Sequence, residues 1–302
     1  MRSSEAQSES VFRHRVLPIL EVILASVIWG SSFVGVKLAL DDAGPFTIAA
    51  LRYSIAAVLL IPFINWRRLL KSQMTPGLWG RFIAIGLSQY TVGNAALFLA
   101  LRMIPATSGS LALSLCPIPV WAFGVFFLRE RPNALQVVGT AAAIGGSLLF
   151  FRSGLVPIPA SAIGLLLVAI LSFAVLPVLG RKLSKARNLG TSAITGVPLA
   201  IGGGVLIVIA LVIEGVPHLP ASTWTIILGL AVVNTVGAYL LFNHALQQMG
   251  AGEANVLLSL TPLSTAAIAW GVFGERMTAL QLCAMAIVIG GIALAQRRTR
   301  RL

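Results

Sequence analysis

Two segments of the sequence carry amide and phenol side chains among apolar residues. These side chains are Gln89, Tyr90, Asn94, Asn234, Tyr239 and Asn243. Within each segment the spacing is roughly helical, so one helix face can present the set. Polar groups removed from water need hydrogen-bond partners. The pattern favours a shared polar cavity that binds a small solute, and hydrogen bonds between neighbouring helices are the alternative.

Trp29 lies in the middle of another apolar segment and is followed by the small residues Gly30, Ser31 and Ser32. Small residues allow close helix approach, and the indole ring beside them can line a cavity or fill the packing between helices. We include Trp29 among the candidate solute-binding residues, together with the six polar side chains above and with Ser114 and Ser259.

Pro117 and Pro262 are candidate hinges in two further apolar segments. A proline inside a helix leaves the carbonyl of the residue four positions earlier, here Leu113 or Leu258, without its hydrogen bond. Interruptions at matched places favour a hinge or a kink. A fixed kink satisfied by a nearby serine hydroxyl is the alternative.

Glu130 and Glu275 are candidate gate elements, because each lies at the end of an apolar segment and is followed by an arginine. A carboxylate at such a place can accept hydrogen bonds from the free N–H groups of a helix N-terminus. We expect the two glutamates to be structural clamps or gates rather than solute ligands.

Arg52 lies about seven residues inside an apolar segment. An arginine in the middle of a membrane helix costs about 2.5–3.5 kcal/mol on insertion scales. We therefore expect it to pair with Asp41 or Asp42, and attraction of an anionic group is the alternative. Glu21, His244 and Glu253 are candidates for proton coupling, but all three lie toward segment ends, which favours movement down a gradient.

The composition indicates that most of the chain lies within a lipid bilayer. The 302 residues are 57% apolar and 10% charged, whereas a soluble domain has about 25% charged residues. This excludes a soluble globular domain, a disordered chain and a coiled coil. The net charge of +13 does not indicate nucleic-acid binding, because the basic residues gather at segment ends. Cys116 and Cys283 lie in apolar stretches, so we expect core residues and neither a disulfide framework nor a metal site nor a cofactor.

Proline, glycine and charged residues divide the chain into ten stretches, each long enough to cross about 30 Å of hydrocarbon. The predicted spans are residues 18–40, 45–65, 80–101, 106–128, 134–151, 161–180, 191–213, 223–246, 253–273 and 279–296. The fold class is therefore an all-α polytopic membrane protein.

The basic residues also predict an orientation. With the N-terminus inside, 17 of the 22 Lys and Arg residues are cytoplasmic, 4 are external and Arg52 is within a span. This bias places both termini in the cytoplasm of a cell with an inner membrane. Residues 1–17 and 297–302 are predicted tails, and the first span is expected to be retained rather than cleaved as a signal.

The chain contains an internal repeat. Residues 100–149 align with 245–294 without a gap, with 18 identical pairs that include both hinge prolines, both gate glutamates and a Gly-Gly pair. We infer two five-helix repeats, 18–152 and 160–296. Because five is odd, the second repeat crosses the membrane inverted, and inverted repeats are typical of secondary transporters.

The residues resemble the drug/metabolite transporter superfamily, in particular its ten-helix EamA-type members. The resemblance is carried by WGSSFVGVKLAL (29–40), ALRYSIAAVLL (50–60) and the paired SLxP…ER…ALQ…GG stretches. Phe173 departs from the pattern, since a tryptophan is common there. The resemblance implies export of small metabolites, often amino acids or other amphiphilic solutes, without naming one.

Other classes fit the sequence less well. An intramembrane enzyme would need a catalytic set such as HExxH, and an ATPase would need a Walker A sequence, neither of which occurs. An exchanger of phosphate esters or nucleotide sugars is the main alternative, and a non-transporting scaffold is another. The expected partners are a small-molecule substrate and the lipid bilayer, with no nucleic acid, and the sequence leaves monomer and homodimer open.

Overall fold

A computed structural model describes residues 16–71, 75–152, 158–185, 189–273 and 278–296, and all regular structure in these ranges is helical. The helical elements of the first repeat are α2 (Leu17–Ala39), α3 (Pro45–Leu60), η2 (Ile61–Phe63), α4 (Trp66–Lys71), α5 (Pro76–Ile85), η3 (Gly86–Gly93), α6 (Asn94–Met103), α7 (Ala106–Leu113), α8 (Pro117–Phe123), η4 (Gly124–Leu128) and α9 (Ala134–Phe151). Those of the second repeat are α10 (Ala160–Phe173), α11 (Val175–Lys185), α12 (Thr191–Ile213), α13 (Ala221–Ala231), η6 (Val232–Gly237), α14 (Ala238–Ala245), α15 (Ala251–Leu257), η7 (Leu258–Leu260), α16 (Thr261–Phe273) and α17 (Ala279–Ala295).

In the described part of the chain these elements join into ten helical spans, as the sequence predicts. Seven are long and apolar enough to cross a bilayer, while the fifth (Ala134–Phe150) and the tenth (Ala279–Ala295) are shorter apolar helices. The ninth runs from α15 through η7 to α16. The prediction of an all-α polytopic membrane protein is confirmed.

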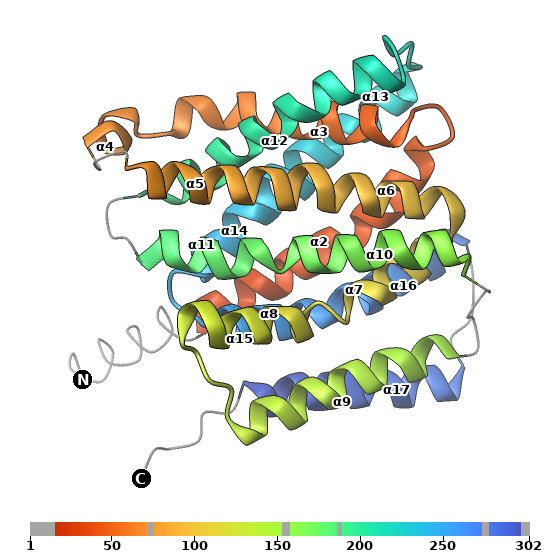
Figure 1. Cartoon of the computed structure of the whole chain (residues 1–302). Coiled ribbons are helices and arrows are strands. Elements are labelled where there is room, and N and C mark those ends of the chain that lie inside the picture. Colours follow the sequence, from red (N-terminus) through yellow and green to blue (C-terminus); the bar gives the residue numbers. More distant parts are fainter. Residues whose placement is uncertain (1–15, 72–74, 153–157, 186–188, 274–277, 297–302) are drawn as a thin grey trace, which may run out of the picture.

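The two repeats pack against each other as a pseudo-symmetric pair. Helix α9 lies along α17 and α3 lies along α12, so the fifth span meets the tenth and the second meets the seventh. Figure 1 shows α9 and α17 as a pair at one side of the molecule and α3 with α12 at the other. Helix α2 packs against α14, and its counterpart α10 packs correspondingly against α6. Exchanging the repeats therefore reproduces these three helix pairings.

Glycines bring α9 and α17 into backbone contact. A Cβ atom on Gly291 would lie 2.7 Å from the Ala143 nitrogen and from the Gly139 oxygen, and one on Gly139 would lie 2.5 Å from the Gly291 oxygen. Gly290 has open space on its own side. Close approach at small residues is the usual way in which helices associate in lipid. The Gly-Gly pair of the repeat therefore has one packing member and one outward-facing member.

Matched π-helical segments interrupt the third and eighth spans. Segment η3 and segment η6 both contain the sequence Thr-Val-Gly, at Thr91 and at Thr235. Each threonine hydroxyl donates to the carbonyl five residues earlier, Thr91 to Gly86 at 3.5 Å and Thr235 to Leu230 at 2.9 Å. π-Helical turns are rare and occur frequently at functional sites, and the hydropathy pattern of the sequence does not predict them.

The fourth and ninth spans are interrupted beside the two prolines identified in the sequence. Helix α7 ends at Leu113 and α8 begins at Pro117, while α15 ends at Leu257 and a 3-10 turn precedes Thr261 and Pro262. Cys116 is buried in the first interruption, as expected, whereas Cys283 is exposed on α17.

Carboxylates hold helix N-termini across the repeats. Glu130 accepts a hydrogen bond from the Ala251 nitrogen at the start of α15 and pairs with Arg181 at 3.4 Å. Glu214 similarly accepts from the Phe46 and Thr47 nitrogens at the start of α3. The interaction expected of Glu130 is therefore present, while Glu275 lies outside the described residues.

Candidate substrate cavity

A cavity of about 120 Å³ lies at the centre of the helical bundle, between the two repeats. Its wall includes α2, the π-helical segment η3 with α6, the two interrupted spans, the junction of α10 with α11, and α14. The lining residues are Trp29, Ser32, Phe33, Val36, Arg52, Gln89, Asn94, Leu97, Phe98, Leu101, Leu113, Cys116, Phe173, Leu176, Pro177, Tyr239, Phe242, Asn255, Leu258, Thr261 and Pro262. Both repeats thus contribute to a single, largely apolar site.

Aromatic rings form one side of the cavity. The Trp29 ring lies 4.9 Å from the Tyr239 ring and 5.4 Å from the Phe242 ring, both edge to face. The Trp29 Nε1 donates to the Asn234 carbonyl at 3.0 Å, which fixes the orientation of the indole. Behind this layer, the Tyr90 ring lies 5.1 Å from that of Tyr239. The aromatic surface is therefore ordered by contacts on several sides.

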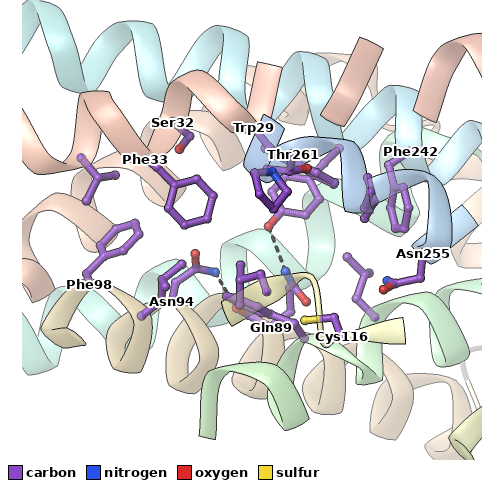
Figure 2. Close-up of a pocket in the computed structure, with 18 of the residues that line it drawn as sticks. Trp29, Ser32, Phe33, Gln89, Asn94, Phe98, Cys116, Phe242, Asn255 and Thr261 are labelled. Carbon is purple, nitrogen blue, oxygen red and sulfur yellow. Dashed lines mark hydrogen bonds between the residues drawn. The ribbon is translucent and has the colours of Figure 1, made fainter. Parts of the chain in front are cut away.

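Polar groups face the same space from the third, eighth and ninth spans. Gln89 Nε2 donates to the Tyr239 hydroxyl at 3.0 Å, and Asn94 Nδ2 donates to the Gln89 carbonyl at 2.6 Å. Figure 2 shows both bonds, with Ser32, Phe33 and Phe98 toward one end of the cavity and Phe242 and Asn255 toward the other. Gln89 Oε1 and Asn255 Oδ1 are buried and have no hydrogen-bond partner among the described residues. These two oxygens can accept hydrogen bonds from a bound solute.

Arg52 contributes a buried cation to the wall, with only 3% of its surface exposed. Its Nε donates to Thr235 Oγ1 at 2.6 Å, its Nη1 to Ser32 Oγ at 2.7 Å and its Nη2 to the Asn234 carbonyl at 3.2 Å. The prediction that Arg52 pairs with Asp41 or Asp42 is wrong. Helix α3 directs the guanidinium toward α2 and η6 inside the bundle, whereas Asp42 is exposed and accepts from Thr223.

The structure places the candidate binding residues in two groups. Trp29, Gln89, Asn94 and Tyr239 line the cavity. The remaining candidates, which are not among the lining residues, are Tyr90, Ser114, Asn234, Asn243 and Ser259. Tyr90 is fully buried behind Tyr239. The candidate hinge Pro262 also lines the cavity, whereas Pro117 does not.

Three of the candidates that do not line the cavity use their side chains for hydrogen bonds within the helical bundle. Asn234 Nδ2 donates to Ser31 Oγ at 2.9 Å, and Asn243 Nδ2 donates to Thr195 Oγ1 at 3.0 Å. Ser114 Oγ donates to the carbonyl of Leu111 at 2.7 Å. Hydrogen bonding between neighbouring helices, the alternative left open by the sequence, describes the two asparagines.

Several lining residues were not predicted from the sequence. Ser32, Phe33, Phe98 and Phe242 were not singled out as binding residues, although each faces the cavity. Phe98 and Phe242 each follow the threonine of a Thr-Val-Gly sequence by seven residues. That matched spacing in the two repeats is the signal that could have identified them.

The proton-coupling candidates lie outside the cavity wall. His244 Nδ1 is 2.8 Å from the Glu21 carboxylate, and 41% of the histidine side chain is exposed. Glu253 accepts from Gln136 Nε2 at 2.8 Å and from the Gly250 nitrogen. Within the described ranges no cluster of three His, Cys, Asp or Glu side chains could hold a metal ion.

The hydroxyl groups of Tyr90 and Tyr239 give a direct test of this geometry. The Tyr90 hydroxyl is buried and has no partner among the described residues, whereas that of Tyr239 is bonded to Gln89. We expect Tyr90→Phe to leave thermal stability unchanged or to raise it, since a buried unsatisfied polar group costs about 1–3 kcal/mol. Tyr239→Phe should lower stability and solute affinity. Thermal unfolding and flux of both variants measure this, and a larger loss in Tyr90→Phe would contradict the assignment.

Comparison with known proteins connects this architecture to a family. The EamA-like transporter family matches residues 16–152 and residues 160–296 separately. A probable amino-acid metabolite efflux pump of Salmonella typhimurium is 28% identical, over 89% of this chain and 91% of its own. An uncharacterized transporter of Archaeoglobus fulgidus is 27% identical, over 91% and 96% of the two chains. The uncharacterized inner membrane transporter YedA of Escherichia coli is 24% identical, over 93% and 91%.

The fold is also found in a solved structure. A crystal structure superimposes with a TM-score of 0.76 at 18% identity, covering 93% of this chain and 96% of the other. The two matched domains account for nearly the whole sequence, and they coincide with the pseudo-symmetric halves that enclose the cavity. The chain is thus a multi-pass membrane transporter, not an enzyme, and it belongs to the EamA-like transporter family.

Proposed function

We propose that the protein exports small amphiphilic metabolites, amino acids among them, by alternating access. The observation that supports this most is the cavity at the interface of the two inverted repeats, which is lined by residues of both. When such repeats exchange conformations, a site between them opens to each side of the membrane in turn. A scaffold has no need of this arrangement.

The cavity wall favours solutes that combine an apolar body with a few polar groups. Trp29, Phe33 and Phe242 offer apolar contact, while Gln89 Oε1 and Asn255 Oδ1 offer acceptors for N–H donors such as an ammonium group. The relative named as a probable amino-acid metabolite efflux pump is consistent with this class. Arg52 is the one Lys or Arg among the described lining residues, which disfavours phosphate esters and nucleotide sugars, because multiply charged anions call for several cations.

The interrupted spans are the proposed moving parts. Pro117 and Pro262 mark breaks at corresponding places in the two repeats, and the break in the ninth span borders the cavity. Glu130 joins the end of the fourth span to Arg181 and to the start of α15. We propose that this cluster is a gate at one end of the bundle and that Glu275 has the corresponding role at the other.

The basic residues support an orientation with both termini in the cytoplasm. The relative named as an inner membrane transporter supports the same membrane for this chain. No carboxylate is present among the described lining residues, which favours movement down a gradient over an obligatory proton relay through the cavity.

Reconstitution into proteoliposomes tests the proposed function. Vesicles are loaded with labelled leucine, phenylalanine, isocaproate or a sugar phosphate, and efflux is followed with and without a pH gradient. We expect efflux of the amphiphilic solutes above that of protein-free vesicles, without dependence on the gradient. Exchange of the sugar phosphate alone, or no flux from folded and inserted protein, would overturn the proposal. Flux only in a pH gradient would overturn the uncoupled mechanism.

A further inference from the structure

Arg52 is a buried cation whose neighbours do not neutralise it. Its three hydrogen bonds end on two hydroxyls and a carbonyl, which are dipoles without net charge. Within the described ranges, its guanidinium takes part in no ion pair with a carboxylate. Since the guanidinium stays protonated in proteins, the positive charge is permanent.

A buried charge without a counter-ion is costly, because the desolvation is only partly offset by dipoles. Charged side chains inside membrane spans face the bundle interior and mark substrate pathways. Arg52 faces the bundle interior, since it is 3% exposed, and it also lines the cavity. Three of its five N–H donors are occupied by the bonds above, so two remain for a ligand.

We propose that Arg52 binds the carboxylate of the transported solute, so that the substrates are monocarboxylates with an apolar body. This inference rests on the proposed transport function and assigns the recognition element of the same cavity. Nη1 already contacts Ser32, which Figure 2 places near Phe33 at one end of the cavity, opposite Phe242 and Asn255. A solute with its carboxylate at this end extends its apolar part between the aromatic rings of Trp29 and Phe33.

The charge of the site and the volume of the cavity limit the class of substrate further. One cation balances one anionic charge, and a dianion would leave a net negative charge in a largely apolar site. A water needs about 10–15 Å³ of such volume, so 120 Å³ holds roughly eight to twelve small groups. Branched and aromatic amino acids and the corresponding simple carboxylic acids have this size.

Matched ligands test the proposal on the unaltered protein. Four compounds share one carbon skeleton, namely leucine, leucinamide, isocaproate and isocaproamide. Each compound is added as a competitor of the uptake of labelled leucine by proteoliposomes. Replacing a charge-assisted hydrogen bond by a neutral one should weaken binding about 10- to 100-fold, both within the pair that carries an amino group and within the pair that lacks it. Equal competition by acid and amide in both pairs would overturn the proposal.

Variants at Arg52 and at the half-buried Lys37 then assign the effect to Arg52. In Arg52→Gln the acid-to-amide ratio should fall to near one, and in Arg52→Lys, which keeps the charge, it should be partly restored. Lys37→Gln is the control, because Lys37 donates to the Leu101 and Ile104 carbonyls and is not itself a lining residue of the cavity. It should keep the wild-type ratio. An unchanged ratio in folded Arg52→Gln protein would contradict the role of Arg52.

The outcomes separate this inference from the transport function. Flux that does not distinguish acids from amides would leave the transporter in place and remove Arg52 as the carboxylate anchor. Absence of flux for every compound, from inserted protein with a native elution profile, would instead remove the transport function. If Arg52→Gln fails to fold, the wild-type comparison of acid with amide still decides the substrate class.

Discussion

Replacing Gly291 by leucine is expected to prevent the fifth and tenth spans from packing together and to abolish most of the folded protein. A Cβ atom at this position already lies 2.7 Å from backbone atoms of Gly139 and Ala143. The clash cannot be relieved by a side-chain rotation, because both atoms belong to the backbone of α9. Inserting bulk into a tight packing site usually costs about 1–3 kcal/mol, and we expect Gly291→Leu to reach or exceed the upper part of that range.

Gly290→Leu is the matched control for this experiment. It adds the same side chain to the same helix one residue earlier, where open space surrounds the position. Thermal unfolding and the monodisperse fraction after extraction from membranes measure both variants. A loss in Gly291→Leu together with near wild-type behaviour of Gly290→Leu is expected. Equal behaviour of the two would show that α9 and α17 do not meet through this face.

Truncating Trp29 to alanine should have the largest effect on solute binding among the aromatic positions. The indole contacts Tyr239 and Phe242 and is held by the Asn234 carbonyl. Removal of a central aromatic anchor typically costs 2 kcal/mol or more, which corresponds to about a 30-fold loss of affinity. Trp29→Phe, which keeps a ring but loses the N–H donor, should be intermediate.

Trp270→Ala provides the comparison, since Trp270 is 48% exposed and does not line the cavity. The half-saturating solute concentration for flux is measured for each variant and corrected for the amount of inserted protein. We expect a change of less than about twofold for Trp270→Ala, because surface substitutions are usually within 0.5 kcal/mol. Equal half-saturating concentrations in Trp29→Ala and Trp270→Ala would contradict a binding role for the indole.

The number of spans and their inverted arrangement could be predicted because both depend on features that sequence displays directly. Span length follows from hydropathy, and the repeat is visible in paired prolines and glycines such as Pro117 with Pro262. The structure also interrupts the two spans beside these prolines. The residue types along the chain were therefore sufficient to predict both the spans and the repeat.

The composition of the cavity could be predicted only in part, because it depends on helix rotation. Tyr90 and Gln89 are adjacent in the sequence, yet Gln89 lines the cavity and Tyr90 packs behind Tyr239. The π-helical segments η3 and η6 alter the rotation of each span after the Thr-Val-Gly sequence. An arginine can likewise satisfy its donors with hydroxyls and carbonyls, so the nearby acidic residues did not identify the partners of Arg52.

The π-helical segments have a consequence for how specificity can change between relatives. A π turn holds about one residue more than an α turn, so deletion of a single residue within Gly86–Gly93 that restores α-helical geometry leaves the later residues of that span on nearly the same face. Asn94 and Phe98, which line the cavity, would therefore keep facing it, whereas residues inside the segment, such as Gln89, would turn relative to them. A one-residue change in chain length therefore alters the part of the wall that the π-helical segment forms in a single evolutionary step, while the rest of the span and its place in the membrane are preserved.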